Sequence, residues 1–402
     1  MAKKVCIVNA HWSNRGDEAA LRPLIDSVCK KGAEIELTVI FKDRKSVQQF
    51  PYKNVEYISA QFLPQKIEDV YNCIHNIGNS DKELQKVVDI LRRTELIIYS
   101  PGGAVVSDKF WWMKQVEYLV PFICAEEFKI PIIVAAPSMG PFDSDLEKNK
   151  YRYKWLSIAK KICVREPISK ECLEGIGLRN VEETIDTAFF DDPDIEINER
   201  LFSNDDELVN FFERNEKIVS FTLSDFSWNV EHKNKKEMLS KVEEDIRKFI
   251  NSLKEKHIGV VLIPQLFGNQ NDLEYLKTFQ DENTYILSDV YDTYFQQYVV
   301  SRCYANVGMR YHSNIFAAKM GTPFIAIGYE EKMYGFMENW GLKDYLIKID
   351  ELDYIKLEST WNYLNESYDK FRQELEDLRE KWRVRAQRTI NIVMESVEDI
   401  IS

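Results

Sequence analysis

Short apolar runs alternate with longer amphipathic stretches through the first half of the chain. The runs predict strands at Val5–Asn9, Glu36–Phe41, Leu96–Ser100, Ile130–Ala135, Lys161–Arg165 and Val181–Asp186. The stretches between them have helical spacing and predict helices at Glu18–Lys31, Asp81–Arg93, Trp112–Phe128, Tyr151–Ala159 and Ser169–Gly175. Strand alternating with helix is typical of a parallel sheet that is covered on both faces.

A polar, acidic segment from about Asp191 to Asn215 interrupts this pattern and is the best candidate for a domain boundary. The alternation then resumes. Strands are predicted at Lys217–Leu223, Ile258–Pro264, Thr284–Ile286, Tyr304–Val307 and Pro323–Ile327. Helices are predicted at Lys235–Lys256, Asp272–Phe279, Tyr291–Ser301 and Ser313–Lys319, and along most of Asp353–Ile401.

The pattern therefore predicts an α/β protein with two doubly wound, Rossmann-like domains. We place the first at residues 1–195, the second at 196–352, and a helical tail that packs on the domains at 353–402. In such sheets ligands bind where loops leave the carboxyl ends of the strands, so these loops are the place to look for chemistry.

Charge and composition narrow the function. A net charge of −13 argues against binding to nucleic acid, because such binding needs Lys and Arg to neutralise phosphates. The N-terminus lacks the apolar core of a signal peptide, and no window approaches the length of a membrane span, so a cytoplasmic location is expected. The seven cysteines are scattered without a C-x-x-C pair, so we expect no metal site and no disulfide.

Two loops of the first half carry candidate binding residues. After the first strand, Asn14, Gly16 and Asp17 open a helix whose free N–H groups suit an anion. The alternative is that the same residues only make a turn and cap the helix. Gly102 and Gly103 follow the third strand and let the backbone approach a ligand closely, although a Gly-Gly pair alone is only a tight turn.

Two further strand ends of the first half carry charged residues. Arg165 ends an apolar strand, where its planar guanidinium can grip a carboxylate or a phosphate. An ion pair with Glu166 or Glu171 is the structural alternative. Asp186 ends the next strand and can serve as a base, accept a sugar hydroxyl or cap a helix.

The densest cluster lies in the second half. A strand delivers Arg310 and His312 immediately before a helix that begins near Ser313 and has unpaired N–H donors at its end. Lys332 follows the next strand and adds a second cation. One arginine, one imidazole and one helix end form an anion site with a proton donor beside it, although a core histidine remains the alternative.

Taken together and in this order, the blocks resemble the polysaccharide pyruvyl transferase family. The matching residues are Asn14, Gly16–Ala19, Pro101–Gly103 with Asp108, Val164–Glu166, Asp186–Phe189, Arg310–His312, Gly321 with Pro323, and Tyr329 with Lys332. The resemblance spans most of the chain. It implies a GT-B-like pair of Rossmann-type domains that face each other across a cleft, and phosphoenolpyruvate as the donor.

By this resemblance the chain would form a pyruvate ketal on a sugar of a cell-surface polysaccharide or of its lipid-linked precursor. A lipid-linked acceptor would imply peripheral contact with a membrane. Arg165, Arg310 and His312 would hold the donor phosphate and carboxylate, with His312 as the acid/base. Asp17 and Asp186 are the other candidate catalytic residues. The remaining donor-binding candidates are Ser313, Lys332, Asn14, Gly16, Gly102 and Gly103.

Elementary chemistry agrees with this donor. Phosphoenolpyruvate carries a phosphate and a carboxylate close together and needs at least two cationic anchors, each worth about 1.5–3 kcal/mol. No cofactor or metal is required. The runner-up is a nucleotide-sugar glycosyltransferase of the same architecture, and a third possibility is a catalytically silent sugar-binding or assembly protein. Trp12, Trp111, Trp112 and Trp228 either stack on a sugar or pack in a core.

Overall fold

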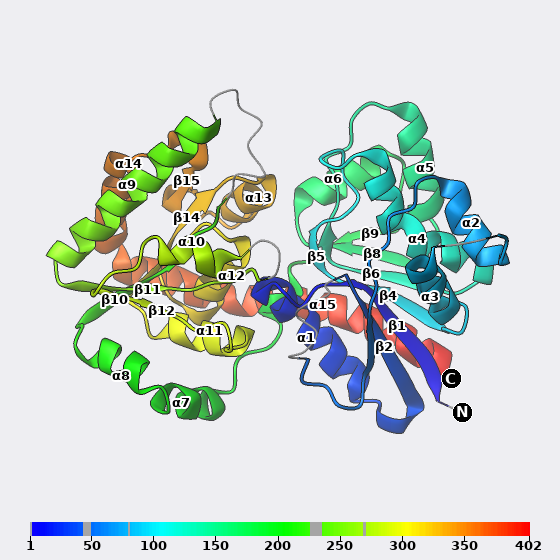
Figure 1. The fold of residues 1–402 in the computed structure, drawn as a ribbon, viewed down its shortest axis with the longest axis horizontal. Coiled ribbons are helices and arrows are strands. Elements are labelled where there is room, and N and C mark those ends of the chain that lie inside the picture. The colour runs from blue at the N-terminus through cyan, green and yellow to red at the C-terminus, as the bar shows by residue number, and fades with distance from the viewer. Residues whose placement is uncertain (1, 43–49, 79–80, 226–234, 268–270) are drawn as a thin grey trace. The chain divides into compact units, whose positions relative to one another are not determined.

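The structure is a computed structural model that describes residues 2–42, 50–78, 81–225, 235–267 and 271–402 (Figure 1). The chain divides into two compact units. Unit 1 comprises Met1–Ser13, Asp17–Phe190 and Arg383–Ser402, and unit 2 comprises Asn14–Gly16 and Asp191–Trp382. The chain thus passes from unit 1 to unit 2 at Phe190, five residues before the boundary placed from the sequence, and the helical tail is shared between the units.

Unit 1 is built on a parallel sheet. Its strands are β1 (Lys3–Ala10), β2 (Ile35–Phe41), β3 (Glu56–Ser59), β4 (Leu96–Tyr99), β6 (Ile132–Ala135), β8 (Lys161–Val164) and β9 (Val181–Glu183). They lie in the order β3-β2-β1-β4-β6-β8-β9, so the strand order reverses between β1 and β4. Two short strands, β5 (Gly102–Ala104) and β7 (Pro137–Ser138), pair with each other beyond the ends of β4 and β6.

Alternate residues of β1, β2, β4, β6 and β8 enter two separate cores. Cys6 and Val8 face the core formed with helices α2 (Ile67–His75), α3 (Lys82–Leu91), α4 (Trp112–Phe128), α5 (Leu146–Leu156) and α6 (Pro167–Gly175). Val5 and Ile7 face the other core, which α1 (Arg15–Cys29) and the end of α15 (Tyr368–Ile401) complete. Because side chains alternate along a strand, near-continuous apolar runs are what a sheet covered on both faces requires.

The last turns of α15 are an integral part of unit 1. Ile390, Val393 and Val397 are buried against β1 and its neighbours. Arg388 forms an ion pair with Glu182, with 2.7 Å between Nε and Oε1. The C-terminal residues therefore close a core whose first strands come from the beginning of the chain.

Unit 2 has a second parallel sheet. Its strands are β10 (Lys217–Thr222), β11 (Ile258–Leu262), β12 (Thr284–Ile286), β13 (Ala305–Gly308), β14 (Phe324–Gly328) and β15 (Leu346–Lys348). They lie in the order β12-β11-β10-β13-β14-β15, which reverses between β10 and β13. Both sheets are thus doubly wound, and each has a reversal point at which loops diverge to leave room for a ligand.

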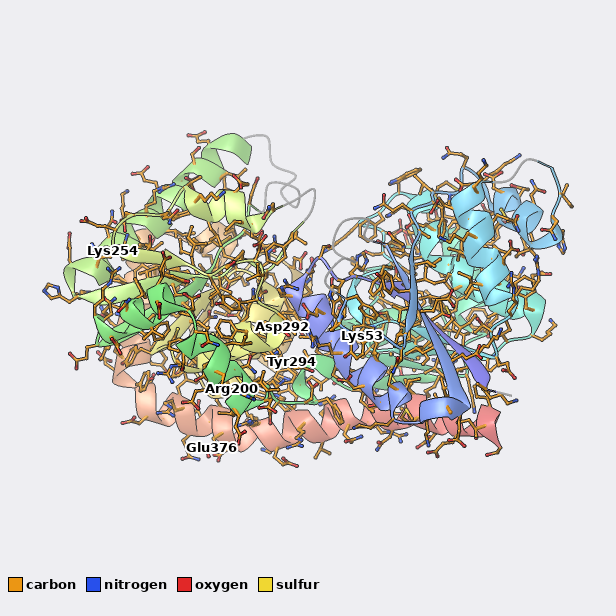
Figure 2. The ribbon with its side chains drawn as sticks, turned by 60° about the horizontal axis from the view of Figure 1, so that its bottom comes forward. Lys53, Arg200, Lys254, Asp292, Tyr294 and Glu376 are labelled. Atoms are coloured by element: carbon orange, nitrogen blue, oxygen red, sulfur yellow. The ribbon has the colours of Figure 1, made fainter. Side chains whose placement is uncertain are left out.

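Helices accompany the strands of unit 2. They are α7 (Ile195–Ser203), α8 (Asp206–Glu213), α9 (Lys235–Glu255), α10 (Asp272–Lys277), α11 (Thr293–Ser301), α12 (Tyr311–Met320), α13 (Glu331–Asn339) and α14 (Tyr354–Glu366). All of them except α7, α8 and α13 correspond to helices predicted from the sequence. Several begin at an aspartate cap. At the start of α11, Asp292 accepts hydrogen bonds from the backbone N–H groups of Tyr294 and Phe295, and Figure 2 labels Asp292 and Tyr294.

The predicted α/β fold is confirmed, and the predicted strands differ from the observed ones mainly at their ends. The acidic segment 191–215, predicted only as a boundary, folds into α7 and α8, because Asp194 and Asp205 cap these helices. Within the described residues, no helix is both long enough and apolar enough to cross a membrane.

Candidate active site

Arg310 stands at the carboxyl end of the unit 2 sheet, between β13 and α12. Asp272, the first residue of α10, holds its guanidinium through both Nε and a terminal nitrogen, with 3.2 Å from Nε to Oδ2. The same Oδ2 accepts hydrogen bonds from the backbone N–H groups of Gln265 and Leu266, the latter at 2.9 Å. Asp272 therefore ties the loop after β11 to the arginine delivered by β13.

The electrostatics of this edge keep Arg310 charged. Burial alone would lower the pKa of its guanidinium, but the charge and hydrogen bond of Asp272, together with the charges of Tyr329 and Glu330, outweigh burial and raise that pKa. Tyr329 directly follows β14, and its phenol interacts electrostatically with Arg310. Burial raises the pKa of this phenol to about 12, and the positive charge of Arg310 opposes that rise. Arg310 is thus a fixed positive charge with a neutral phenol beside it.

His312 lies in the first turn of α12 and is buried. Its ring meets the ring of Tyr311 edge to face, with 5.3 Å between centroids. The loop before it is fastened by polar side chains: Ser313 Oγ donates to the carbonyl of Arg310 at 2.7 Å, and Asn314 Nδ2 donates to the carbonyl of Gly308 at 2.9 Å. The imidazole is therefore presented from a braced helix end, where N–H groups favour an anion.

The first loop of the chain packs directly on this histidine. Gly16 belongs to unit 2, and a Cβ at this position would overlap Nδ1, Cγ and Cβ of His312. Asn14 Oδ1 accepts the backbone N–H of Gly16 at 2.9 Å and so shapes the turn. Gly16 is therefore required for close approach to the imidazole.

Arg15 anchors the same loop in unit 2. Its backbone N–H donates to the carbonyl of Gln265 at 2.8 Å, and its guanidinium donates to the carbonyl of Asp289 at 2.8 Å. The guanidinium also lies over the ring of Phe267, 5.0 Å from the centroid. Arg15 and Arg310 consequently both contact the segment after β11, Arg15 at Gln265 and Phe267 and Arg310 at Asp272.

Lys332 is held close to the same loops. Its Nζ lies 2.5 Å from a carboxylate oxygen of Glu330 and 5.7 Å from the centre of the Tyr311 ring. The predicted candidates Arg310, His312, Ser313, Lys332, Asn14 and Gly16 are therefore all found around the start of α12 or the strand end beside it.

In unit 1, Arg165 forms a buried ion pair with Asp186. The distance from a terminal nitrogen to Oδ2 is 2.6 Å, and both side chains have 0% exposure. Nε of Arg165 donates to Ser138 Oγ at 2.9 Å. Asp186 also accepts the backbone N–H of Ala188 at 3.0 Å and caps a short 3₁₀ turn. Asp186 thus caps a helical turn, which was the structural alternative for this residue. Arg165 forms the ion pair that was its structural alternative, and the partner is Asp186, whereas Glu166 or Glu171 was expected.

Asp17 and Gly102 form the neighbouring part of this edge. A Cβ at Gly102 would lie 3.6 Å from Asp17 Oδ1, and Gly102 has a φ of 153°, which glycine tolerates far better than other residues. Gly102 pairs with Pro137 in the β5–β7 ribbon, and Ser138 of the same ribbon contacts Arg165. The ribbon thus connects the Asp17–Gly102 pair to the arginine. Gly103 follows in β5, and a Cβ added there would meet no atom within 4 Å beyond its chain neighbours.

Sequence reasoning missed three residues that hold these candidates in place, namely Asp272, Gln265 and Ser138. It also missed the ion pair of Lys42 with Glu117 at another strand end of unit 1. Lys42 directly follows β2, and Ser138 follows β6 by three residues. The rule that strand ends carry chemistry applies to both, although neither stands in a conspicuous motif. Asp272 carried no such signal, because an aspartate at a helix start is an ordinary cap.

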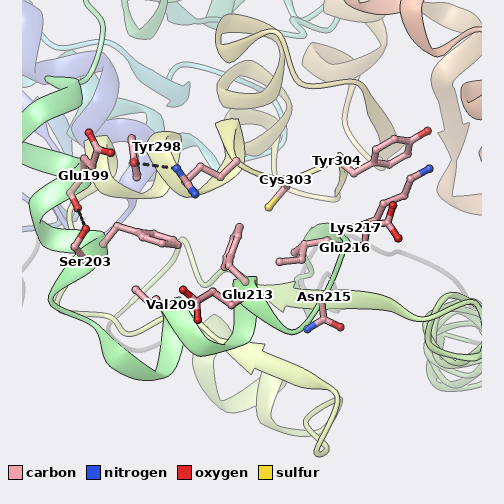
Figure 3. A pocket seen from close by; sticks show the side chains of 14 residues that line it. Glu199, Ser203, Val209, Glu213, Asn215, Glu216, Lys217, Tyr298, Cys303 and Tyr304 are labelled. Carbon is pink, nitrogen blue, oxygen red and sulfur yellow. Dashed lines mark hydrogen bonds between the residues drawn. The ribbon is translucent and has the colours of Figure 1, made fainter.

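A cavity of about 550 Å³ lies elsewhere in unit 2, at the opposite edge of the sheet (Figure 3). Lys217, the first residue of β10, lines it together with Glu213, Arg302 and Tyr304. Its walls come from α7, α8 and α11, and the carboxyl end of β10 lies about 16 Å away at the usual rise per residue. The cavity is therefore separate from Arg310 and His312. Among the described residues, no group of three His, Cys, Asp or Glu side chains is arranged to hold a metal.

Comparison with protein families and relatives identifies what the chain is similar to. A family model described as polysaccharide pyruvyl transferase matches residues 14–331. The amylovoran biosynthesis protein AmsJ of Erwinia amylovora is 23% identical over 426 residues, which cover 98% of this chain and all of the relative. The matched range contains every candidate residue of both units except Lys332, which lies one residue beyond it.

Solved structures resemble the fold. UDP-GlcNAc 2-epimerase from Neisseria meningitidis has a TM-score of 0.60 at 12% identity, over 98% of this chain and 100% of its own. A putative UDP-N-acetylglucosamine 2-epimerase from Listeria monocytogenes has a TM-score of 0.61 at 12% identity, covering 99% and 98%. The glycotransferase of kitacinnamycin has a TM-score of 0.52 at 12% identity, covering 98% and 99%. The fold is thus of the GT-B type, with two Rossmann-like units.

Proposed function

Because the chain belongs to the polysaccharide pyruvyl transferase family, we propose that it transfers the enolpyruvyl group of phosphoenolpyruvate to a sugar of a cell-surface polysaccharide or of its lipid-linked precursor. The product is a pyruvate ketal, and phosphate is released. A cytoplasmic location, with membrane contact only through a lipid-linked acceptor, is part of the proposal. No cofactor or metal takes part.

The observation that carries the proposal is the pairing of Arg310 with His312 at the start of α12. A guanidinium kept charged by Asp272 can bind the donor phosphate through charge-assisted hydrogen bonds, and the helix end adds N–H donors. Arg165 is the proposed partner of the donor carboxylate. Lys332 and Ser313 are proposed to complete the anion site, as are the backbones of Asn14, Gly16, Gly102 and Gly103.

His312 is the proposed acid/base. Its imidazolium gives a proton to the methylene carbon of the donor, and the first sugar hydroxyl adds to the carbon that bears the phosphate. The proton of this hydroxyl leaves with the phosphate. The second hydroxyl then closes the ketal, and its proton returns to His312. Asp17 and Asp186 are proposed to orient the hydroxyls and Arg165, respectively.

Ligand-dependent thermal stability and phosphate release test this function. Phosphoenolpyruvate is expected to raise the melting temperature, whereas UDP and UDP-sugars leave it unchanged, because only a ligand that binds the native state stabilises it. Arg310→Ala and Arg165→Ala should each abolish the shift. His312→Gln should keep the shift but lower phosphate release in the presence of acceptor at least 100-fold.

The reverse pattern would contradict the proposal. Stabilisation by UDP-sugars and not by phosphoenolpyruvate would indicate a glycosyltransferase. Normal phosphate release by a folded His312→Gln variant would remove the imidazole from the mechanism. A function unaffected by either arginine variant would indicate a sugar-binding or assembly protein.

A further inference from the structure

The beginning of α4 gathers charged and aromatic side chains at the carboxyl edge of the unit 1 sheet. Lys114, Glu117 and Tyr118 lie in its first two turns, and Trp111 directly precedes the helix. Positions 114, 117 and 118 have the spacing of one helix face, and the carbonyl of Trp111, the N-cap residue, accepts the backbone N–H of Lys114 at 3.0 Å. Lys42 reaches this face from the end of β2: its Nζ lies 2.7 Å from Glu117 Oε1 and 3.7 Å from the centre of the Tyr118 ring.

Two lysines share one carboxylate in this cluster. Lys114 Nζ lies 2.6 Å from the second oxygen of Glu117. Glu117 is 6% exposed and Lys114 is 33% exposed, so Lys114 is the more accessible member of the pair. An ammonium group can donate three hydrogen bonds, and Glu117 accepts only one from each lysine. Lys114 can therefore still donate a hydrogen bond to a ligand.

Burying the charged Lys42 in this cluster costs folding free energy, which a purely structural element would avoid. Burial lowers the pKa of Lys42 to about 8, although the charge of Glu117 opposes that shift. Replacing a buried ion pair by apolar side chains is often neutral or stabilising, so packing alone does not explain a buried lysine here. A charged group kept in such a position at a sheet edge is a candidate for binding a ligand.

Strain and unsatisfied polar atoms lie around the same edge. Asn9 has a φ of 59° at an irregularity in β1, and its buried Oδ1 has no hydrogen-bond partner among the described residues. The next residue, Ala10, accepts the backbone N–H of Lys42 at 3.0 Å. The buried hydroxyl of Tyr99, whose pKa is raised by burial and by the nearby Tyr118 and Glu117, is also without a partner in the described residues. Such features concentrate at functional sites.

The position of the cluster separates it from the proposed donor residues. β2 and β8 are four places apart in the sheet, so the strand ends that carry Lys42 and Arg165 are about 19 Å apart. A molecule as small as phosphoenolpyruvate cannot span that distance. Asp17 and Gly102 lie between the two places, at the reversal point between β1 and β4. The cluster therefore fits a second ligand beside the first.

Trp111 indicates the class of that ligand. Its side chain is 59% exposed, whereas Trp12 is buried in the core and Trp112 packs on the ring of Tyr151. Trp228 lies outside the described residues. An exposed indole one helical turn before hydrogen-bonding charges suits a molecule with an apolar face and a polar rim, which describes a pyranose ring. Lys42 and Lys114 balance Glu117 and Asp17, whose charge acts on Tyr118, so the net charge favours a neutral sugar over a phosphate.

We infer that Trp111, Lys114 and Glu117 form a saccharide-binding site in unit 1, with Lys42 behind them. The indole packs on the C–H face of a pyranose, Lys114 donates to a ring hydroxyl, and Glu117 fixes both lysines. That this sugar is the acceptor rests on the proposed function, whereas the binding itself does not.

Saturation-transfer NMR on the full-length protein tests the site with three probes: methyl glucopyranoside, methyl galactopyranoside and methyl mannopyranoside. At least one is expected to bind, and Trp111→Ala and Lys114→Met should each weaken its binding at least 10-fold. Tyr153→Ala and Lys150→Met are the matched controls, because these are exposed residues of α5 in the same unit. Both controls should bind as the unmodified protein does.

The inference is overturned if none of the three pyranosides binds, or if a folded Trp111→Ala variant binds as tightly as the unmodified protein. Thermal melting identifies a variant that has not folded, and Trp111→Phe, which keeps an aromatic face, should then restore part of the binding. Failure of the proposed function would be seen separately, as absence of phosphoenolpyruvate-dependent phosphate release while pyranoside binding persists.

Discussion

The carboxyl edges of the two sheets each carry an arginine that is paired with an aspartate, but the two arginines differ in their exposure to solvent. In unit 1, Arg165 and Asp186 form an ion pair with no exposure of either side chain. In unit 2, the Arg310 side chain keeps 12% exposure while Asp272 holds it, and an imidazole and a helix end lie beside it. A carboxylate positions a guanidinium in both units, and in unit 2 the imidazole of His312 is buried in the first turn of the helix that follows this arginine. On the proposed function, Arg165 of unit 1 would position the donor, whereas His312 of unit 2 would transfer the proton.

The largest expected effect compares the two carboxylates. Asp186→Asn leaves Arg165 as a buried cation without its counter-charge, which costs about 3–5 kcal/mol of unfolding free energy. Asp272→Asn should cost about half as much, because Arg310 retains access to solvent. Hydrogen exchange of peptides from β8 and β9 on one side, and from β11 and β13 on the other, reports each unit separately. Asparagine can still cap the turn at Asp186, so the cap is controlled for. Equal losses would show that enclosure does not distinguish the two edges.

A second prediction concerns the buried lysine of unit 1. Burial lowers the pKa of Lys42 to about 8 in the folded protein, whereas the ordinary pKa of 10.5 applies in the unfolded chain. Between these values the unfolded chain binds more protons, so folding becomes more favourable as pH rises. The unfolding free energy of the unmodified protein, relative to Lys42→Met, should therefore increase by up to about 3 kcal/mol from pH 8 to 10.5. Chemical denaturation across this range measures it.

Lys150→Met is the control for this measurement, because Lys150 is exposed in the same unit. Relative to that variant, the unmodified protein should show no comparable gain. If Lys42→Met and Lys150→Met gave the same pH dependence, Lys42 would not be a cation destabilised by burial.

The smallest effect concerns the imidazole of unit 2 alone. Gly16→Ala places a methyl group where the His312 ring lies, so the ring must move. We expect a 10- to 100-fold loss of turnover, or about 1.4–2.7 kcal/mol, with little change in the melting shift given by phosphoenolpyruvate. Gly175→Ala, which has no atom within 4 Å of its added Cβ, is the matched control. Unchanged turnover in Gly16→Ala would mean that the position of the imidazole does not matter.

Much of this molecule could be predicted from the sequence for one physical reason. Parallel strands covered on both faces are continuously apolar, so runs such as Leu96–Ser100 are conspicuous and their ends point to the ligand edge. That logic located Arg165, Asp186, Arg310 and His312. It did not show which carboxylate pairs with which arginine, because Arg310 and Asp272 are brought together by the sheet and not by their spacing in the chain.

The same limit applies to short polar segments. The acidic stretch after Phe190 contains two helices that were not predicted, because they have few apolar positions. In the sequence Lys42 cannot be distinguished from a surface lysine, because its contacts with Glu117 and Tyr118 form only in the folded protein. Gly16 shows the opposite case: its place after the first strand suggested contact with a ligand, and the structure shows contact with His312.

The return of the chain to unit 1 at Arg383 has a consequence for biosynthesis. The strands of unit 1 leave the ribosome first, yet one face of their sheet awaits the last turns of α15, which are made after all of unit 2. At ordinary rates of translation this interval is about 10–40 s. The second core of unit 1 therefore cannot close until the synthesis of unit 2 is over, so this sheet stays uncovered on one face throughout that interval.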